Sequence, residues 1–349
     1  MTPDLIKMGE CISSTFGLLD CYASVRRALA GTQSAIIVFH RVSPGLFPWF
    51  TEAVTPEDFE KEISYICRVG HVVPLDWLVQ RIYEGKSIPP GTVCITFDDG
   101  FKDNFEFAYP ILLEYGVPAT IFLTTGYIGN GAIFPSLIAR FAVWNTVMER
   151  FEMNVLGRFD LRTSAGKASA MRRIDLFIKY HPEEADCLVE TLLDVLDIAP
   201  PDDLGGKLML SWDEIMQMKR NGISFGAHTV THPILSRVPL EVARGEITRS
   251  KDEIEQRLEQ PCTIFAYPNG LADDFNNDVV EIVKQNAFVA AVTAIPELLG
   301  GRLKDPFRLP RVSSGQSYDG FKCRFSGLYP DLMAAVSRLE GKSNSSYSK

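Results

Sequence analysis

Short apolar runs alternate with amphipathic segments along most of the chain. Runs of β-branched and other apolar residues indicate buried strands; they lie at 35–39, 71–74, 92–97, 118–123, 223–227, 263–267, 288–293 and near 307–312. Segments with helical spacing lie between them, at 56–69, 76–83, 104–115, 211–221, 240–258 and 278–285. Because strands and helices alternate, the pattern predicts a parallel sheet with helices outside it.

The alternation stops between residues 130 and 206, where no strong buried strand is found. Helical patterns cover 134–150, 167–180 and 183–196, and 152–161 with Gly157 at its middle resembles a small hairpin. A stretch rich in proline, aspartate and glycine follows at 199–206 and resembles a linker. We interpret this part as a mostly helical insertion.

The number of strand–helix units favours closure of the sheet into an α/β barrel, in which chemistry is found at the C-terminal ends of the strands. We therefore divide the chain into four parts. They are an N-terminal amphipathic segment (1–30), a barrel in two pieces (31–129 and 207–318), the insertion (130–206), and a C-terminal helix with a disordered polar tail (319–349).

The N-terminal segment has apolar residues at helical spacing over 5–29. It predicts an amphipathic helix that either packs on the main domain or lies on a membrane surface. The first ten residues lack the basic-then-apolar pattern of an export signal. No apolar run approaches the roughly 18 residues of a transmembrane helix. We therefore expect a cytoplasmic protein, peripheral at the inner membrane surface if this helix binds lipid.

The charge and the cysteine content of the chain exclude some classes of partner and of covalent cross-link. The formal net charge of -9 argues against nucleic acid, because phosphate-binding proteins usually carry a basic face. The seven cysteines are dispersed and form no CxxC pair. An odd, scattered set indicates reduced thiols rather than a disulfide framework.

Two adjacent carboxylates follow the apolar run at 92–97. Asp98 and Asp99 precede Gly100, which permits a tight turn. Neighbouring residues of an extended chain point in opposite directions, so one aspartate can bind a metal while the other accepts a proton. The alternative interpretation is a solvated Asp-Asp-Gly turn.

Two histidines follow the apolar run at 223–227. His228 and His232 are four residues apart in the sequence His-Thr-Val-Thr-His-Pro, and Pro233 disfavours a regular helix at this point. Histidines at this spacing can converge on one ion in a tight turn. With one carboxylate they would make a hydrolytic metal site that suits zinc, although other divalent metals of the first transition row also fit. Structural histidines are the alternative.

Several motifs resemble those of the polysaccharide deacetylases, the NodB-homology group of carbohydrate esterases. They are TFDDG at 96–100, the H-T-x-x-H-P motif at 228–233, and FAYPNG at 265–270. The similarity covers about residues 35–125 and 208–312. It implies a distorted (β/α)7 barrel and a divalent metal, with zinc as the first expectation.

The resemblance also implies roles for individual residues. Asp98 is expected to be the general base, and Asp99, His228 and His232 the metal ligands. The backbone N–H of Tyr267 is expected to stabilise the tetrahedral oxyanion. Substrate contacts are expected from Tyr267, Asn269 and Trp212.

The chain departs from the family pattern at two places. The arginine that orients the base aspartate in many members is replaced by Ala266, and we expect Arg311, in Leu-Pro-Arg at 309–311, to supply the guanidinium. No histidine follows His232 to protonate the leaving amine. His40 ends the run at 35–39, and Phe-His-Arg-Val at 39–42 resembles the N-terminal histidine motif of circularly permuted poly-N-acetylglucosamine deacetylases. We expect His40 to be the general acid.

Three interpretations of function remain open at this point. The first is an N-deacetylase acting on a polymer such as poly-N-acetylglucosamine, or on a lipid-linked or nucleotide-linked sugar. The second is a non-catalytic carbohydrate-binding or scaffold protein of the same fold. The third is an O-deacetylase or cyclic-amide hydrolase, because the same metal chemistry serves other acyl bonds.

Overall fold

The computed structural model describes residues 34–45, 53–300, 305–315 and 317–326. The predicted N-terminal amphipathic segment at 1–30 and the polar tail at 341–349 lie outside these residues. No helix within the described ranges is long and apolar enough to cross a bilayer. Cys67, Cys94, Cys187 and Cys262 are free thiols.

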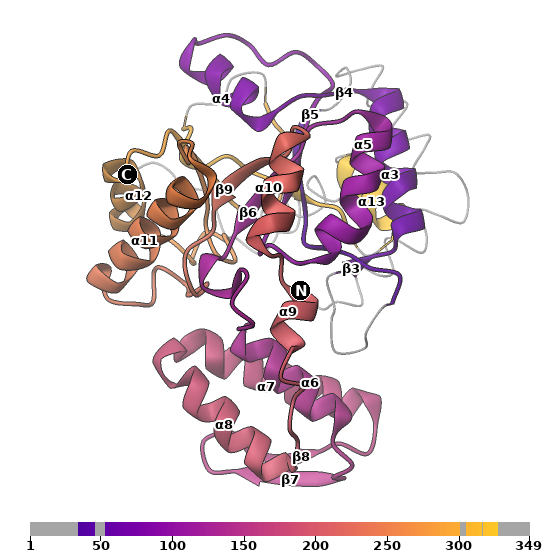
Figure 1. Ribbon diagram of the computed structural model, residues 1–349, viewed down its shortest axis with the longest axis vertical. Coiled ribbons are helices and arrows are strands. Elements are labelled where there is room, and N and C mark those ends of the chain that lie inside the picture. Colours follow the sequence, from indigo (N-terminus) through magenta and orange to yellow (C-terminus); the bar gives the residue numbers. More distant parts are fainter. Residues whose placement is uncertain (1–33, 46–52, 301–304, 316, 327–349) are drawn as a thin grey trace, which may run out of the picture.

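An eight-stranded parallel sheet forms the centre of the molecule (Figure 1). Its strands are β1 (Ala35–Phe39), β4 (His71–Val72), β5 (Thr92–Phe97), β6 (Thr120–Leu123), β9 (Ser224–Ala227), β10 (Ile264–Ala266), β11 (Ala290–Val292) and β12 (Val312–Ser313). The strand order is β11-β10-β9-β6-β5-β1-β12, with β4 paired to β5. Two further strands, β2 (Arg41–Val42) and β3 (Ala53–Val54), pair beside it.

The sheet closes through the segment at 309–313. Leu309 forms a parallel bridge with Val292 of β11. Three residues later Val312 pairs with Ile37 of β1. One segment therefore joins the two edges, which gives the distorted (β/α) barrel expected from the resemblance. The predicted strand near 307–312 is present as this bridge and the short β12.

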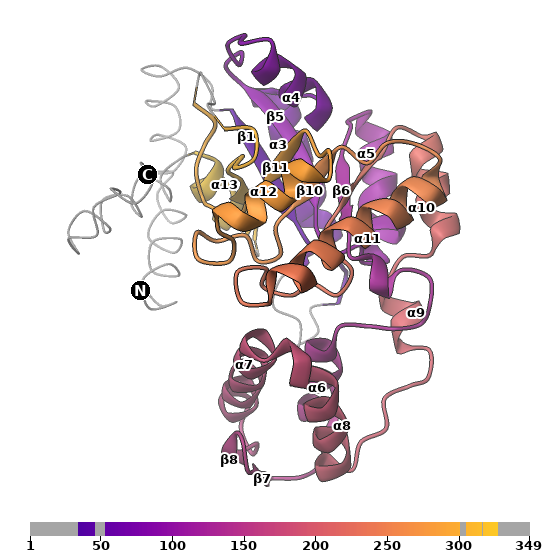
Figure 2. The same ribbon diagram turned by 90° about the vertical axis from the view of Figure 1, so that its left-hand side faces the viewer.

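The barrel helices flank the sheet (Figure 2). They are α3 (Pro56–Val69), α4 (Leu75–Tyr83), α5 (Tyr109–Tyr115), α10 (Trp212–Arg220), α11 (Leu240–Leu258), α12 (Asn277–Gln285) and α13 (Tyr318–Phe325). Capping residues explain several starts: Thr55 accepts from Asp58 N–H ahead of α3, and Ser211 forms a capping box with Glu214 ahead of α10.

Successive residues along the strands belong alternately to two different hydrophobic clusters. Ile36, Cys94, Phe122 and Val292 pack with Leu78 of α4 in one cluster. Their chain neighbours, such as Ile37 and Ile95, belong to the larger cluster that includes helices outside the sheet. This period of two is the one expected of strands buried on both faces. In Figure 1, α4 lies at one end of the barrel and the insertion at the other.

The insertion contains α6 (Pro135–Asn145), the antiparallel hairpin β7 (Arg150–Met153) and β8 (Gly157–Asp160), α7 (Ser164–Tyr180), α8 (Ala185–Leu196) and α9 (Leu204–Leu208). The hairpin agrees with the predicted one. The predicted linker at 199–206 was wrong in its second half, because α9 begins at Leu204.

A continuous helix at 104–115 was also predicted, and the structure differs there. Residues Asn104–Ala108 form a π-helical turn before α5. Pro110 cannot donate the backbone hydrogen bond that an α-helix would require at that position, and π-turns are often found at functional sites. The turn lies beside β2, near the carboxylates that follow β5.

Candidate active site

The expected site residues come from several elements of the barrel and gather at the C-terminal ends of its strands. His40 follows β1, Asp98 and Asp99 follow β5, and His228 follows β9. Asn269 lies three residues after β10. The parallel topology therefore unites positions that are far apart in the chain, at the barrel end that faces the insertion.

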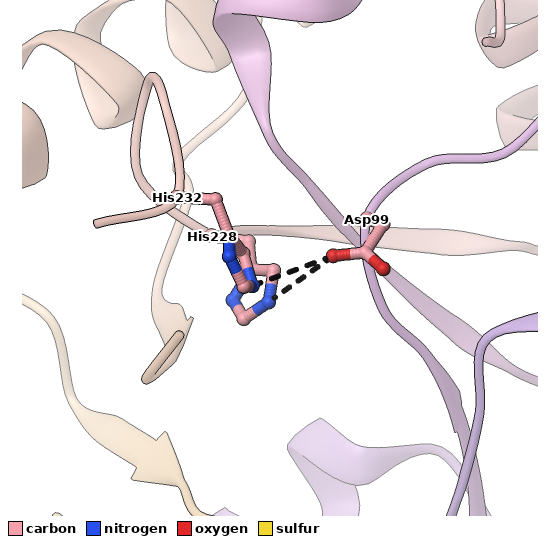
Figure 3. A group of neighbouring side chains, drawn as sticks. All are labelled: Asp99, His228 and His232. Atoms are coloured by element: carbon pink, nitrogen blue, oxygen red, sulfur yellow. Dashed lines mark ion pairs between the residues drawn. The ribbon is translucent and has the colours of Figure 1, made fainter. Parts of the chain in front are cut away.

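Asp99, His228 and His232 form a compact group of potential ligands (Figure 3). The Oδ1 atom of Asp99 lies 3.6 Å from Nε2 of His228 and 3.6 Å from Nε2 of His232. Tetrahedral zinc with bonds of about 2.1 Å separates its ligand atoms by roughly 3.4 Å. The donor set and its spacing therefore fit a small divalent metal. A second group on the insertion, His181, Glu183 and Glu184, is exposed to solvent.

Backbone geometry turns these side chains toward one another. Asp99, Thr229 and His232 have φ values of 75°, 67° and 64°, in the left-handed region that side chains other than glycine disfavour. Such strain persists only where surrounding contacts hold it, and it is concentrated at functional sites. Thr229 Oγ1 accepts a hydrogen bond of 3.0 Å from His232 N–H and closes the turn.

Glu246 of α11 forms hydrogen bonds with the same loop. Its role was not predicted from the sequence. Its buried carboxylate accepts hydrogen bonds of 2.8 Å from the backbone N–H groups of Val230 and Thr231, and one of 3.0 Å from Thr231 Oγ1. The one available signal was an acidic residue on the buried face of a predicted helix. Glu246 therefore fixes the loop that carries both histidines.

Both histidines are suited to ligation as neutral rings. Nδ1 of His228 lies 2.8 Å from the carbonyl oxygen of Ala266, which it can meet only as a donor, so Nε2 keeps its lone pair toward Asp99. Burial lowers the pKa of His228 to about 4, and burial followed by the charge of His228 lowers that of His232. Neutral imidazole is the form that binds a metal.

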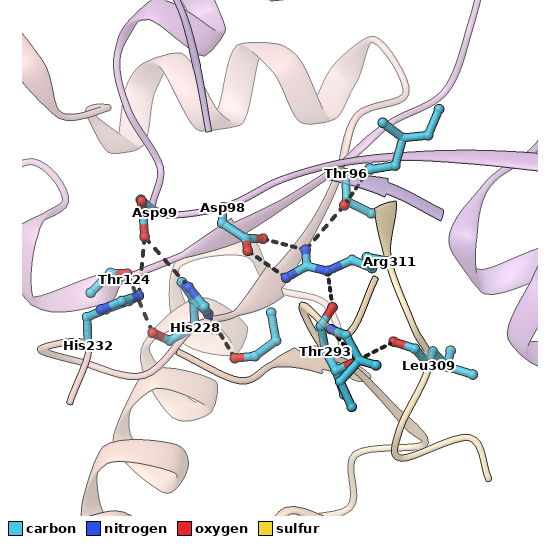
Figure 4. Close-up of polar contacts among 12 residues, drawn as sticks. Thr96, Asp98, Asp99, Thr124, His228, His232, Thr293, Leu309 and Arg311 are labelled. Atoms are coloured by element: carbon cyan, nitrogen blue, oxygen red, sulfur yellow. Dashed lines mark hydrogen bonds and ion pairs between the residues drawn. The ribbon is translucent and has the colours of Figure 1, made fainter. Parts of the chain in front are cut away.

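Asp98 forms a buried bidentate pair with Arg311 (Figure 4). Nη1 and Nη2 of Arg311 lie 2.7 and 2.6 Å from the two carboxylate oxygens, and Nε donates to the carbonyl oxygen of Thr293 at 2.8 Å. Arg311 thus makes the contact with Asp98 that we expected in place of the arginine missing at Ala266. Burial alone would raise the pKa of Asp98, but the charge of Arg311, its hydrogen bonds and the nearby rings of His228 and His40 together hold the pKa below its usual range.

His40 faces the same pocket. A cavity of about 170 Å³ is lined by His40, Asp99, His232, Asn269 and residues of the insertion. The amide of Asn104 donates to the His40 carbonyl oxygen at 2.9 Å and to Asp103 at 3.3 Å. Asp103 in turn pairs with buried Arg41. A polar network that starts in the π-helical turn therefore holds the chain on the C-terminal side of His40.

Two expected residues do not reach this pocket. The backbone N–H of Tyr267 donates to Val292 at 3.2 Å, and its hydroxyl donates to Phe307 at 3.1 Å. Both groups form hydrogen bonds within the barrel wall. Tyr267 therefore does not make the oxyanion and substrate contacts expected from the sequence. Trp212 opens α10 and lies against Arg257, outside the cavities that contain the ligands. Asn269, with a φ of 57°, does line the pocket.

The sequence is similar to a known protein family and to several of its members. Residues 85–291 match the family model described as polysaccharide deacetylase. YxkH of Bacillus subtilis (strain 168), named among polysaccharide deacetylases, is 22% identical over 292 residues, which are 82% of this chain and 74% of that protein. A Staphylococcus aureus poly-beta-1,6-N-acetyl-D-glucosamine N-deacetylase is 35% identical over 80 residues, 22% of this chain and 27% of that enzyme.

Solved structures share the fold. IcaB from Ammonifex degensii superposes with a TM-score of 0.55 at 16% identity, over 85% of this chain and 98% of that one. The Streptococcus pyogenes deacetylase PplD gives 0.53 at 18% identity, over 81% and 92%. Because the family model spans more than half of the sequence and its barrel is present, the chain belongs to the polysaccharide deacetylase family.

Proposed function

We propose that this protein is a metal-dependent hydrolase that removes N-acetyl groups from a glycan containing N-acetylhexosamine. The substrate is a polymer similar to poly-N-acetylglucosamine or a lipid-linked saccharide. One observation carries the proposal: His40 and a potential metal site meet at one small pocket, and the carboxylate held by arginine, Asp98, directly precedes the ligand Asp99. Family membership and the poly-N-acetylglucosamine deacetylases among the relatives support the same substrate chemistry.

Asp99, His228 and His232 would hold the metal, with zinc as the first candidate. The bound metal would supply Lewis-acid polarisation of the acetyl carbonyl and make water more acidic. The remaining steps belong to the chain itself. Arg311 keeps Asp98 ionised and oriented, so that its carboxylate accepts the proton of the attacking water.

His40 then donates a proton to the nitrogen of the leaving amine, because an amide nitrogen departs poorly as an anion. Its position in the pocket with Asp99 and His232 suits that task. We propose that Asn269 takes the substrate-facing place that the sequence assigned to Tyr267, since Asn269 lines the pocket and Tyr267 does not.

The test is acetate release by the purified chain after metal removal and after addition of zinc, cobalt or manganese. Substrates should include β-1,6- and β-1,4-linked N-acetylglucosamine oligosaccharides, their lipid-linked forms and an O-acetylated glycan. We expect metal-dependent release from the N-acetylated saccharides and none after chelation. Asp99→Ala should lose both metal and activity. Metal binding without release from any acetylated sugar would instead identify a carbohydrate-binding protein, and preference for the O-acetylated glycan an esterase.

A further inference from the structure

The insertion forms one wall of the pocket that contains the proposed metal ligands. Helix α6 begins immediately after Phe134, and its residues Ser136 and Arg140 line the 170 Å³ cavity together with Asp99 and His232. The substrate must therefore contact the insertion as soon as its acetyl group reaches the ligands.

A second cavity of about 410 Å³ continues from the first. It shares Phe134, Ser136, Arg140, His232 and Asn269 with the smaller cavity. From there it runs between the His232 loop of the barrel and the insertion helices α7 and α8. The metal site thus lies at one end of a groove whose walls come from the barrel and the insertion, the two layers that Figures 1 and 2 show one below the other.

The volumes of the two cavities limit the size of the ligand that each can hold. Binding pockets for small molecules typically occupy roughly 300–1,000 Å³. The cavity at the metal ligands is smaller than this range, whereas the groove alone falls within it. A ligand that places one sugar residue at the ligands therefore has room for at least one further residue in the groove.

The groove side chains favour a neutral, hydroxyl-rich ligand. Nε and Nη2 of Arg140 lie 2.9 and 2.7 Å from one oxygen of Asp175, so the guanidinium is held in place by a residue of α7. Lys179 and Asp186 also line the groove, so it carries charges of both signs. Tyr127 and Phe134, with ring centroids 4.3 Å apart, add an aromatic wall. Two cationic and two anionic side chains balance one another, so the groove gives no net attraction to a polyanion, and a fully apolar ligand would leave all four charges without water.

We propose that this groove binds the sugar residue adjacent to the one that loses its acetyl group, so that the preferred substrate is a neutral N-acetylated oligosaccharide of at least two units. The proposal rests on the proposed deacetylase function. Arg140, positioned by Asp175, contacts the substrate close to the reacting residue, and Lys179 contacts the neighbouring sugar. The insertion thereby selects chain length.

Binding without turnover provides the test. Chelator-treated protein is titrated by calorimetry with N-acetylglucosamine and with its β-1,6- and β-1,4-linked tetrasaccharides. Wild-type protein should bind one tetrasaccharide at least tenfold more tightly than the monosaccharide. Arg140→Ala and Lys179→Ala should each remove most of that difference, since a hydrogen bond to a charged group is worth about tenfold in affinity. Arg172→Ala is the matched control: Arg172 is an exposed residue of α7 that lines neither cavity.

Melting temperatures identify a variant that fails to fold, and Lys179→Ala is the safer of the two because it leaves the Arg140–Asp175 pair intact. Equal affinity of wild-type protein for monosaccharide and tetrasaccharides would overturn the proposal. So would unchanged tetrasaccharide binding by well-folded Arg140→Ala and Lys179→Ala. The proposed catalytic function fails separately: length-dependent binding without metal-dependent acetate release would keep the groove and reject the deacetylase.

Discussion

Arg311 and Asp98 are 213 residues apart in the chain, and they form a doubly hydrogen-bonded ion pair that is almost fully buried. The pair joins the end of β5 to the segment that closes the barrel. Arg311 also binds the carbonyl oxygen of Thr293, so the guanidinium is held on both sides. The orientation of the proposed base thus depends on closure of the barrel.

The first prediction concerns this pair. Arg311→Ala leaves a buried carboxylate without its partner, which typically costs about 3–5 kcal/mol of stability. We expect a lower melting temperature and at least a hundredfold loss of kcat. Arg311→Lys keeps the charge but loses the bidentate contact, so its melting temperature and kcat should lie between those of wild type and Arg311→Ala. The Arg311→Ala/Asp98→Asn double variant should recover stability but not activity; full additivity of the two stability losses would show that the pair is not coupled.

Much of the barrel was predictable because local signals agreed with the tertiary fold. The bounds of α3 and α11 match the predicted ranges, since an N-cap threonine and a long amphipathic pattern define them. A parallel sheet brings the residues that follow its strands to one edge. The sequence therefore indicated that four residues after apolar strands would meet: Asp98, Asp99, His228 and His232. No local pattern marks Arg311; only the absence of an arginine at position 266 indicates that another basic residue must pair with Asp98.

The errors have physical causes that the sequence does not display. Tyr267 lies two residues before Asn269 in the motif, and only the hydrogen bond of its N–H to the carbonyl oxygen of Val292 shows that it still belongs to the strand ladder. Glu246 is one of many charged residues on α11, and its role depends on a loop sixteen residues earlier. The π-helical turn follows from the missing N–H of Pro110, which the apolar pattern at 104–115 does not display.

The second prediction concerns His40. His40→Ala should bind metal normally and lose roughly 10²–10⁴ in kcat toward N-acetylated sugars, because it removes the proton donor. An acetyl ester with a good leaving group, such as 4-nitrophenyl acetate, needs no such proton and should be affected much less. Equal losses on amide and ester substrates would contradict the assignment of His40 as acid.

The third prediction concerns Asn104, which donates to the His40 carbonyl oxygen. Asn104→Ala should misplace His40 and lower kcat on the amide about tenfold with little change in KM, while ester hydrolysis stays near normal. Asn104→Asp, of similar size but without the donor, should behave like Asn104→Ala. A loss shared equally by amide and ester would indicate general damage to the site instead of positioning of His40.

The fourth prediction concerns metal affinity. Glu246 accepts three hydrogen bonds from the loop that carries His232, and residues of this kind typically contribute 10–100-fold to metal binding. Glu246→Gln should therefore weaken zinc binding by about that factor, measured by competition with a chromogenic chelator. Glu241→Gln, an exposed change in the first turn of the same helix, should leave the zinc affinity unchanged.

The last prediction concerns Glu62 of α3, which is fully buried and whose carboxylate oxygens have no hydrogen-bond partner among the described residues. Burial raises the pKa of Glu62 well above its ordinary value. The folded state then binds a proton that the unfolded state has released, so stability falls as pH rises from about 4.3, the unfolded value, toward the folded one. Glu62→Gln removes this loss and should melt a few degrees above wild type at pH 8, with the difference shrinking toward pH 4. Glu60→Gln, exposed on the same helix, is the control and should show no such pH dependence. A pH-independent fall in melting temperature for Glu62→Gln would mean that the carboxylate is held ionised by a partner.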